Sequence, residues 1–286
     1  MQTVFSISVR DEICRTKLKN KCCRRSQLCG MVLGLLTPSG ISVSSDRENV
    51  ALCFSKLLHE FLPSLKTSSP FLYSRAEADL ITSSLGIDGT ASLPVGQFTC
   101  VNCGWAFIRG LFAVCGTVAD PASGYHLEYL LRSSEIADGL CRLFEGLGYT
   151  PGITERRGSY GVYFKDSEAI ADILGYMGAP SSEFEMLNAK ILKDVRNGVN
   201  RTVNCETANM NRTCAASSAQ IKAIEKIASS PDTVASLTEE LKTTLDLRIA
   251  NPDATLSELA ELHDPPVTKS GVTHRLQKLM KIASKL

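Results

Sequence analysis

The sequence is most informative near its C-terminal end, over Asp253-Ala-Thr-Leu-Ser-Glu-Leu-Ala-Glu-Leu-His-Asp-Pro-Pro-Val-Thr-Lys-Ser-Gly-Val-Thr-His-Arg-Leu-Gln-Lys-Leu-Met-Lys281. Thr255, followed by Glu258 three residues later, forms a capping-box pattern, so we expect a helix to begin there. The residues at helical spacing after it predict one buried face: Leu256, Leu259, Ala260 and His263. Asp264-Pro265-Pro266 ends this helix, because proline lacks an N–H donor and restricts the residue before it.

A second helix is predicted to begin near Thr268. Its apolar residues share one side: Val272, Leu276, Leu279 and Ala283. The opposite side carries polar and basic residues: Lys269, Ser270, Thr273, His274, Gln277 and Lys278. Two short helices around a sharp turn are typical of a helix-turn-helix, whose second helix lies in the major groove of DNA.

The charge of this segment favours DNA as its partner. From Pro265 to Leu286 there are five basic residues and no acid. Cationic side chains suit phosphates, and hydroxyl, amide and imidazole groups suit base edges. We predict base contacts from Lys269, Ser270, Thr273, His274 and Gln277. We predict phosphate contacts from Arg275, Lys278 and Lys281. The alternative is an ordinary helical hairpin with a solvated basic face.

Length and composition are those of a chain with two domains. The 286 residues are enough for two cores, and the net charge is only +1, so affinity for nucleic acid has to come from clustered charge. One further cluster lies within eleven positions near the N-terminus and is equally compatible with a solvated surface or a phosphate contact: Arg15, Lys17, Lys19, Lys21, Arg24 and Arg25. No run of about 18 apolar residues is present, so we expect no membrane span. The N-terminus is too polar for a signal peptide, so we expect a cytoplasmic protein.

The eleven cysteines show no disulfide framework, and we interpret them as reduced thiols. Cys100-Val-Asn-Cys103 has the spacing of a metal or redox pair, but a zinc site needs four ligands. A second such pair is missing, and Cys22, Cys23 and Cys29 lie elsewhere in the sequence. The histidines are also scattered: His59, His126, His263 and His274. We therefore expect neither a metal nor a cofactor.

Two similar halves precede the C-terminal part. The second half is predicted as helix, two strands, helix, two strands, helix: 104–116, 117–121, 125–132, 134–147, 150–157, 160–165 and 166–175. The first half is predicted as an apolar helix from Ser26 to Gly40, strands 41–44 and 50–54, a helix at 56–62 and an extended segment at 71–75, with 76–100 unassigned. The order αββαββα in two copies indicates an internal duplication with a pseudo-twofold axis.

The two helix ends resemble a known motif. Val32-Leu-Gly-Leu-Leu-Thr-Pro-Ser-Gly40 and Ile108-Arg-Gly-Leu-Phe-Ala-Val-Cys-Gly116 resemble the LAGLIDADG motif of homing endonucleases. That resemblance implies two helices packed through glycines, each ending in an acid that holds a catalytic divalent metal. Ser39 and Cys115 occupy the matching positions, and neither is a hard carboxylate. Asp46, Asp120 and Glu128 are nearby in sequence but not at the helix ends. The alternative is two core helices of a duplicated α/β domain.

A polar run follows an amphipathic helix predicted from Phe184 to Val195. Asparagine and arginine are dense there, and both suit contacts with phosphates and bases. We predict DNA-backbone contacts from Arg196, Asn197, Asn200, Arg201 and Asn204. The alternative is a polar loop whose asparagines bond locally to the backbone.

Three segments together resemble the WhiA family of Gram-positive bacteria, over essentially the full length: Arg196-Asn-x-x-Asn-Arg-x-x-Asn-Cys-Glu-x-Ala-Asn209, Leu247-Arg-Ile-Ala-Asn-Pro-Asp-Ala-Thr-Leu-Ser-Glu-Leu259 and Lys269-Ser-Gly-Val-Thr-His-Arg-Leu276. The resemblance implies a degenerate LAGLIDADG domain tethered to a helix-turn-helix that is similar to region 4 of sigma factors. It also implies a DNA-binding regulator of sporulation septation or cell division.

The expected fold is therefore α+β, with a duplicated αββαββα LAGLIDADG-like domain followed by an all-α helix-turn-helix domain. Its expected parts are an N-terminal arm or helix (1–25), the duplicated domain (26–180), a connecting helix with the Asn/Arg-rich joint (181–215) and the helix-turn-helix domain (216–286). The expected function is non-catalytic, sequence-specific regulation of transcription at promoter DNA, with a sigma factor or RNA polymerase as a further partner and a nucleoid-associated location. Two rivals stay open: a metal-dependent endonuclease using displaced acids such as Asp120, and a protein-interaction module of the division or transcription machinery.

Overall fold

The computed structural model describes residues 3–65, 69–87 and 93–286. The chain forms two compact units, Met1–Asp194 and Val195–Leu286. Every helix in the described ranges is too short or too polar to cross a lipid bilayer.

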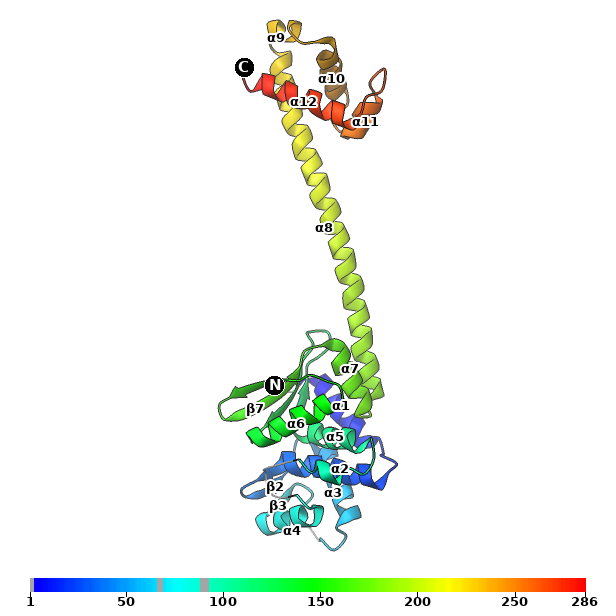
Figure 1. The fold of residues 1–286 in the computed structure, drawn as a ribbon, viewed down its shortest axis with the longest axis vertical. Coiled ribbons are helices and arrows are strands. Elements are labelled where there is room, and N and C mark those ends of the chain that lie inside the picture. Colours follow the sequence, from blue (N-terminus) through cyan, green and yellow to red (C-terminus); the bar gives the residue numbers. More distant parts are fainter. Residues whose placement is uncertain (1–2, 66–68, 88–92) are drawn as a thin grey trace. The chain divides into compact units, whose positions relative to one another are not determined.

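Helices α2 (Lys21–Leu35) and α5 (Cys103–Cys115) pack against each other at the centre of the N-terminal unit (Figure 1). A Cβ atom on Gly30 would lie 2.2 Å from the carbonyl oxygen of Phe107, and one on Gly110 would lie 2.0 Å from that of Gln27. Only glycine permits backbones to come this close. The predicted packing of the two helices through glycines is confirmed, but the glycine of α2 is Gly30, which lies outside the predicted motif Val32–Gly40.

The same contacts correct the alignment of the first motif. Gly30 and Gly110 each face the residue three positions before the other, as a twofold relation between the halves requires. Counting from these glycines, the partner of Cys115 is Leu35 rather than Ser39. Helix α2 ends at Leu35, and Ser39 lies in the turn between β1 (Leu36–Thr37) and β2 (Gly40–Ser42), so its predicted place at a helix end is wrong.

The second half has the predicted order. After α5 come β4 (Gly116–Val118), β5 (Leu127–Leu131), α6 (Ser134–Gly146), β6 (Gly152–Arg156), β7 (Ser159–Phe164) and α7 (Ser167–Tyr176). The four strands form an antiparallel sheet in the order β4-β5-β7-β6. Tyr129 of β5 contacts both Phe112 of α5 and Phe144 of α6, with ring centroids 5.9 and 5.7 Å apart. Both helices therefore cover the same face of this sheet.

The first half departs from the prediction in two elements: the helix predicted to reach Gly40 ends at Leu35, and a predicted strand is helical. It contains β1, β2, α3 (Glu48–Phe61), β3 (Leu72–Ser74) and α4 (Arg75–Leu85), with a three-stranded antiparallel sheet in the order β1-β2-β3, and a short 3-10 helix follows (Val95–Gln97). The strand predicted at 50–54 is wrong, because these residues begin α3. Val50, Ala51, Phe54 and Leu58 recur at helical spacing and are buried together, and this longer period overrides the local apolar run.

Residues near the N-terminus belong to the core rather than to an arm. Helix α1 (Val4–Arg15) begins at Thr3, whose side chain accepts a hydrogen bond from the Ser6 amide. Phe5, Val9 and Ile13 recur every four residues and are buried in the main core of the N-terminal unit. Residues 1–2 of the predicted arm lie outside the described ranges.

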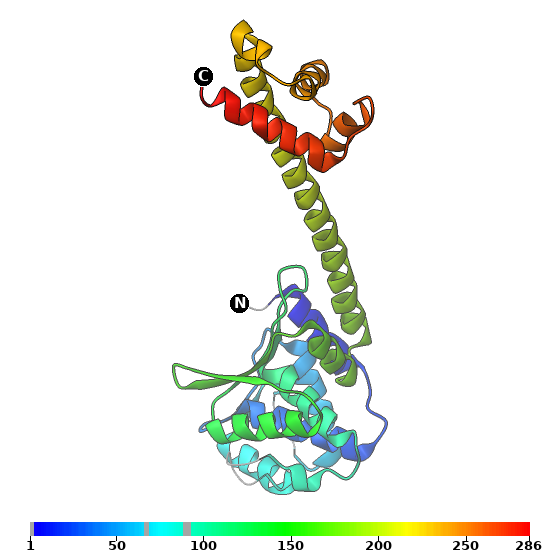
Figure 2. The same ribbon diagram turned by 45° about the horizontal axis from the view of Figure 1, so that its top comes forward.

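The C-terminal unit is entirely helical where it is described. Its helices are the later part of α8 (Pro180–Ala228), then α9 (Pro231–Ala235), α10 (Glu239–Ala250), α11 (Leu256–Glu261) and α12 (Lys269–Ala283). Ile224 and Ile227 of α8 share a separate core with Leu259 of α11 and Leu276 of α12. Figure 2 shows α12 (red) lying across the end of α8.

We expect Gly110→Ala to lower the free energy of unfolding of the N-terminal unit by about 2–3 kcal/mol, because its methyl group would overlap the backbone of α2. Trp105 is the only tryptophan and is buried in this unit, so its fluorescence during urea unfolding reports on this unit. Gly146→Ala is the matched control: a Cβ atom added there would have no neighbouring atom within 4 Å, and the change should stay below about 1 kcal/mol. Equal stability of the two variants would contradict the close helix contact.

Candidate nucleic-acid interface

Helix α12 has an exposed polar face and a buried apolar face that packs against the rest of the C-terminal unit. Thr268 caps it, with its hydroxyl oxygen accepting a hydrogen bond from the Gly271 amide at 3.1 Å. Its buried residues are those that the sequence predicted: Val272, Leu276, Leu279 and Ala283. At the other end, the Lys226 amine donates to the Ala283 carbonyl at 3.1 Å. The apolar side thus fixes which side chains face outward.

The turn before α12 is built as predicted. Glu258 accepts from the Thr255 amide at 2.7 Å and donates its own amide to the Thr255 hydroxyl at 3.3 Å, which completes the capping box. The hydrogen bond from the Thr255 backbone lowers the pKa of Glu258. His263 is buried and bonds through one ring nitrogen to the Thr244 hydroxyl (2.9 Å) and through the other to the Leu259 carbonyl (2.7 Å). This histidine joins α10 to the turn.

Most of the predicted contact residues of α12 are exposed. They are Lys269, Ser270, His274, Gln277, Lys278 and Lys281. Thr273 is half-buried, and its hydroxyl donates to the Lys269 carbonyl at 2.8 Å. Arg275 is also half-buried and lies 3.5 Å from the Glu240 carboxylate of α10. The lysines are therefore more accessible to a phosphate than Arg275 is.

The Asn/Arg-rich run lies inside helix α8 rather than in a loop. Its five predicted contact residues are all exposed: Arg196, Asn197, Asn200, Arg201 and Asn204. At about 100° per residue they span about 140° of the helix circumference, so they form one face. Val195 and Val199 lie outside this arc, on the other side of the helix. The helix thus gathers these amides and guanidinium groups into a continuous polar strip.

Arg248 is a positioning residue that sequence reasoning missed. It is buried, and it donates to the Gln220 side-chain oxygen of α8 (2.8 and 3.1 Å) and to the Ala254 carbonyl just before α11. Burial lowers its pKa. It fixes the loop that starts the helix-turn-helix. Its position inside the Leu247–Leu259 segment, which carries the family resemblance, could have indicated a structural role for Arg248.

A cavity of about 790 Å³ lies where the C-terminal ends of the two motif helices meet. Leu36 and Cys115 line it, together with three arginines, Arg47, Arg75 and Arg132. No aspartate or glutamate is among its described lining residues, so Asp46, Asp120 and Glu128 stay outside it. Burial raises the pKa of Cys115 to about 12, which keeps the thiol neutral. A lining with three arginines and no carboxylate favours an anion in this cavity over a hard divalent cation.

Guanidinium groups neutralise the end of α5. Arg10 donates to the Gly116 carbonyl and Arg47 to the Val114 carbonyl. Burial, with a smaller contribution from Arg47, lowers the pKa of Arg10 to about 10, so it stays charged at neutral pH. Cations at this position complement the negative end of the helix dipole. Sequence reasoning missed both arginines because they come from α1 and from the residue before α3.

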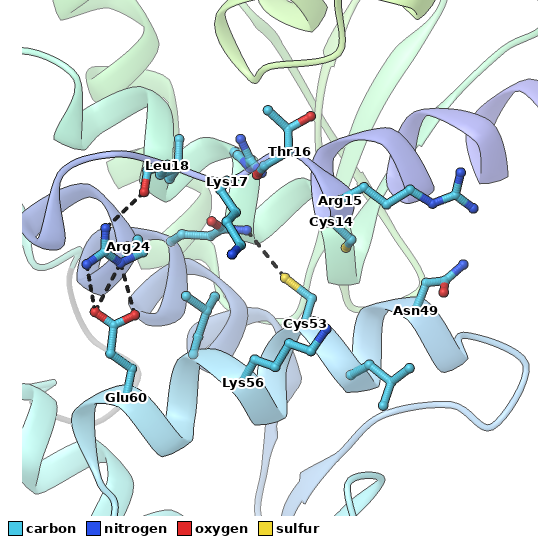
Figure 3. Close-up of a pocket in the computed structure, with 14 residues that line it drawn as sticks. Cys14, Arg15, Thr16, Lys17, Leu18, Arg24, Asn49, Cys53, Lys56 and Glu60 are labelled. Carbon is cyan, nitrogen blue, oxygen red and sulfur yellow. Dashed lines mark hydrogen bonds and ion pairs between the residues drawn. The ribbon is translucent and has the colours of Figure 1, made fainter.

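Three residues of the N-terminal basic cluster, Arg15, Lys17 and Arg24, line a second cavity of about 610 Å³ (Figure 3). Arg24 is engaged internally: it pairs with Glu60 at 2.9 Å and donates to the Leu18 carbonyl at 2.9 Å. Lys17 and Lys56 add two amines to the lining. Part of the cluster therefore serves internal contacts, and its predicted role toward phosphate stays a prediction.

Both units are similar to known protein families. The family profile described as "WhiA C-terminal HTH domain" matches residues 199–283, and that described as "WhiA LAGLIDADG-like domain" matches residues 105–196. The "Probable cell division protein WhiA" of Alkaliphilus metalliredigens is 32% identical over 313 aligned residues, covering 98% of each chain. The protein of the same name from Clostridium botulinum is 31% identical and covers 99% of this chain and 98% of the relative.

A solved structure shows the same fold. The crystal structure of full-length WhiA from Thermatoga maritima has a TM-score of 0.58 and 24% sequence identity, covering 99% of both chains. The fold is thus α+β, with a LAGLIDADG-like N-terminal domain containing two small antiparallel sheets and an all-helical C-terminal part.

Proposed function

The chain belongs to the WhiA family, and on that premise we propose that it is a sequence-specific DNA-binding regulator of transcription that acts in cell division and does not cut DNA. The observation that carries the proposal is the exposed, acid-free face of α12 at the second helix position of a helix-turn-helix. A helix placed in this way enters the major groove.

The side chains of α12 divide between two tasks in this proposal. Lys269, Ser270, His274 and Gln277, with Thr273, face base edges, where amide and amine groups distinguish purines. Lys278 and Lys281, together with Arg275, contact phosphates and set the register of the helix on the duplex.

The polar strip of α8 supplies a second set of backbone contacts in the proposal. Arg196 and Arg201 offer two guanidinium groups, and Asn197, Asn200 and Asn204 add amides that bond to phosphate oxygens. The exposure of all five side chains on one face supports this role.

The absence of catalysis follows from the chemistry of the motif helix ends. Cleavage by a two-metal mechanism needs carboxylates that clamp divalent ions beside the scissile phosphate. The corresponding positions carry Leu35 and a neutral Cys115 beside arginines. We infer that the LAGLIDADG-like unit serves as a scaffold or binding platform.

The relatives are named as cell division proteins, and the family resemblance adds sporulation septation as the process served. A helix-turn-helix similar to region 4 of sigma factors fits promoter DNA as the target. It also makes a sigma factor or RNA polymerase the expected protein partner, with the nucleoid as the place of action.

Substitutions on α12 test the groove assignment. We expect Lys269→Ala and Gln277→Ala each to weaken binding to a cognate promoter fragment by about 1–3 kcal/mol, measured by fluorescence anisotropy. Lys278→Ala should weaken binding to every sequence and reduce the salt slope by about 1. Lys222→Ala removes an exposed cation of the same unit outside α12 and should leave sequence discrimination unchanged. Parental affinity in both the Lys269 and Gln277 variants would show that α12 does not read the groove.

The double variant Arg196→Ala/Arg201→Ala tests the α8 strip. Loss of two phosphate contacts should reduce the slope of log K against log salt by about 2, because each contact releases about one counterion. Val195→Ala/Val199→Ala alters the other side of the helix and should leave the slope as it is. A slope that is flat even in the parent would favour the protein-interaction module.

The nuclease alternative has a direct test. Supercoiled plasmid incubated with the purified protein and Mg²⁺ should remain intact, since the helix ends offer no carboxylate pair. Asp120→Asn is the informative variant: nicking by the parent that disappears in this variant would establish a displaced catalytic acid.

A further inference from the structure

Four of the eleven cysteines meet at one point of the N-terminal unit. Cys22 and Cys23 lie in the first turn of α2, Cys103 is the first residue of α5, and Cys100 precedes it by three positions. Their sulfur atoms all lie within 4.8 Å of one another. Cys22 and Cys23, which lie elsewhere in the sequence, are thus close in space to Cys100 and Cys103. The packing of α2 on α5 brings together two pairs that are 77 residues apart, measured from Cys23 to Cys100.

The distances suit one shared ion. The Cys100 sulfur lies 3.4 Å from that of Cys23, 3.5 Å from that of Cys103 and 3.6 Å from that of Cys22. Four sulfurs at about 2.3 Å from a tetrahedral zinc ion are about 3.8 Å apart. A disulfide would instead bring two sulfurs to about 2.05 Å and break this even spacing. All four cysteines are free thiols here.

The donor set selects the metal. Four thiolates are soft ligands that suit zinc and do not suit magnesium or calcium. An iron–sulfur cluster distributes its four cysteines over two or four irons, which spreads their sulfurs further apart than a single ion does. The compact sulfur group therefore favours one mononuclear zinc ion.

The surroundings resemble those of a metal-bound thiolate. The Cys103 amide donates to the Cys100 carbonyl at 3.0 Å, which closes a tight turn between these two ligands. Leu18, Phe98 and Ala106 cover the group with apolar surface. The positive ends of two helices add a favourable field for the negative sulfurs.

One feature differs from the usual pattern of two Cys-x-x-Cys pairs. Cys22 and Cys23 are adjacent, and adjacent helical residues point about 100° apart. Both sulfurs nevertheless reach Cys100, because this residue lies in the segment that crosses the end of α2.

We propose that Cys22, Cys23, Cys100 and Cys103 bind one Zn²⁺ ion that fastens the N-terminal end of α2 to that of α5. Four protein ligands leave no open position for water or substrate, so the site is structural. Along the chain, α2 and α5 are separated by the whole first half of the duplication. The ion would add a bonded link between their N-terminal ends to the helix packing at Gly30 and Gly110.

Metal analysis of the purified full-length protein, prepared without chelators, tests the proposal. We expect about one zinc per chain by plasma mass spectrometry. The variant Cys100→Ser/Cys103→Ser should lose the zinc. The control Cys141→Ser/Cys205→Ser removes two thiols far from the group in sequence and should keep it.

A cobalt titration of the metal-stripped parent protein tests the same site without depending on whether the cysteine variant folds. Co²⁺ should give the visible absorption of tetrahedral thiolate coordination, with Zn²⁺ displacing it at one equivalent. Zinc removal should also lower the urea midpoint that Trp105 fluorescence reports, because binding free energy adds to folding free energy. Zinc-free protein with eleven titratable thiols, octahedral cobalt spectra, or a native disulfide among the four cysteines would each overturn the proposal.

Discussion

The backbone contact between α2 and α5 at Gly30 and Gly110 is the constraint from which the rest of the N-terminal unit follows. Because the two helices meet without intervening side chains, both of their ends are also brought together. One pair of ends gathers four sulfurs, and the other gathers arginines around a cavity. The two ends of the helix pair therefore differ in chemistry: thiols lie at the N-terminal ends and guanidinium groups at the C-terminal ends.

Caps, turns and alternating strands were predicted correctly from the sequence. Features that depend on burial or on residues far apart in the chain were not. The capping box at Thr255, the stop at Asp264-Pro265-Pro266 and the alternating strands β6 and β7 depend on residues a few positions apart, so the sequence predicts them correctly. The strand predicted at Val50–Phe54 failed because burial of the whole α3 face decides its conformation. The four-cysteine group and the Leu35–Cys115 pairing depend on which helix faces which, and no local pattern contains that information.

Charge along the sequence overstates the charge that is available to a ligand. Arg10, Arg109 and Arg248 are buried, and each donates to a backbone carbonyl. These arginines serve internal contacts, whereas the lysines of α12 and the arginines of the α8 strip are among the cations that face solvent. A local cationic surface on a chain with a net charge of only +1 therefore depends on clustering of the exposed cations, as in the acid-free stretch from Pro265 to Leu286.

In the proposed complex with DNA, the ion pair between Arg275 and Glu240 would make one phosphate contact an exchange rather than a gain. A phosphate that engages Arg275 has to displace a carboxylate already in place, and Glu240 is then left beside the polyanion. The net attraction at this residue is therefore smaller than at a lysine whose only prior partner is water. Removal of the carboxylate would release the guanidinium group, so tighter but less discriminating association is the natural consequence of neutralising Glu240.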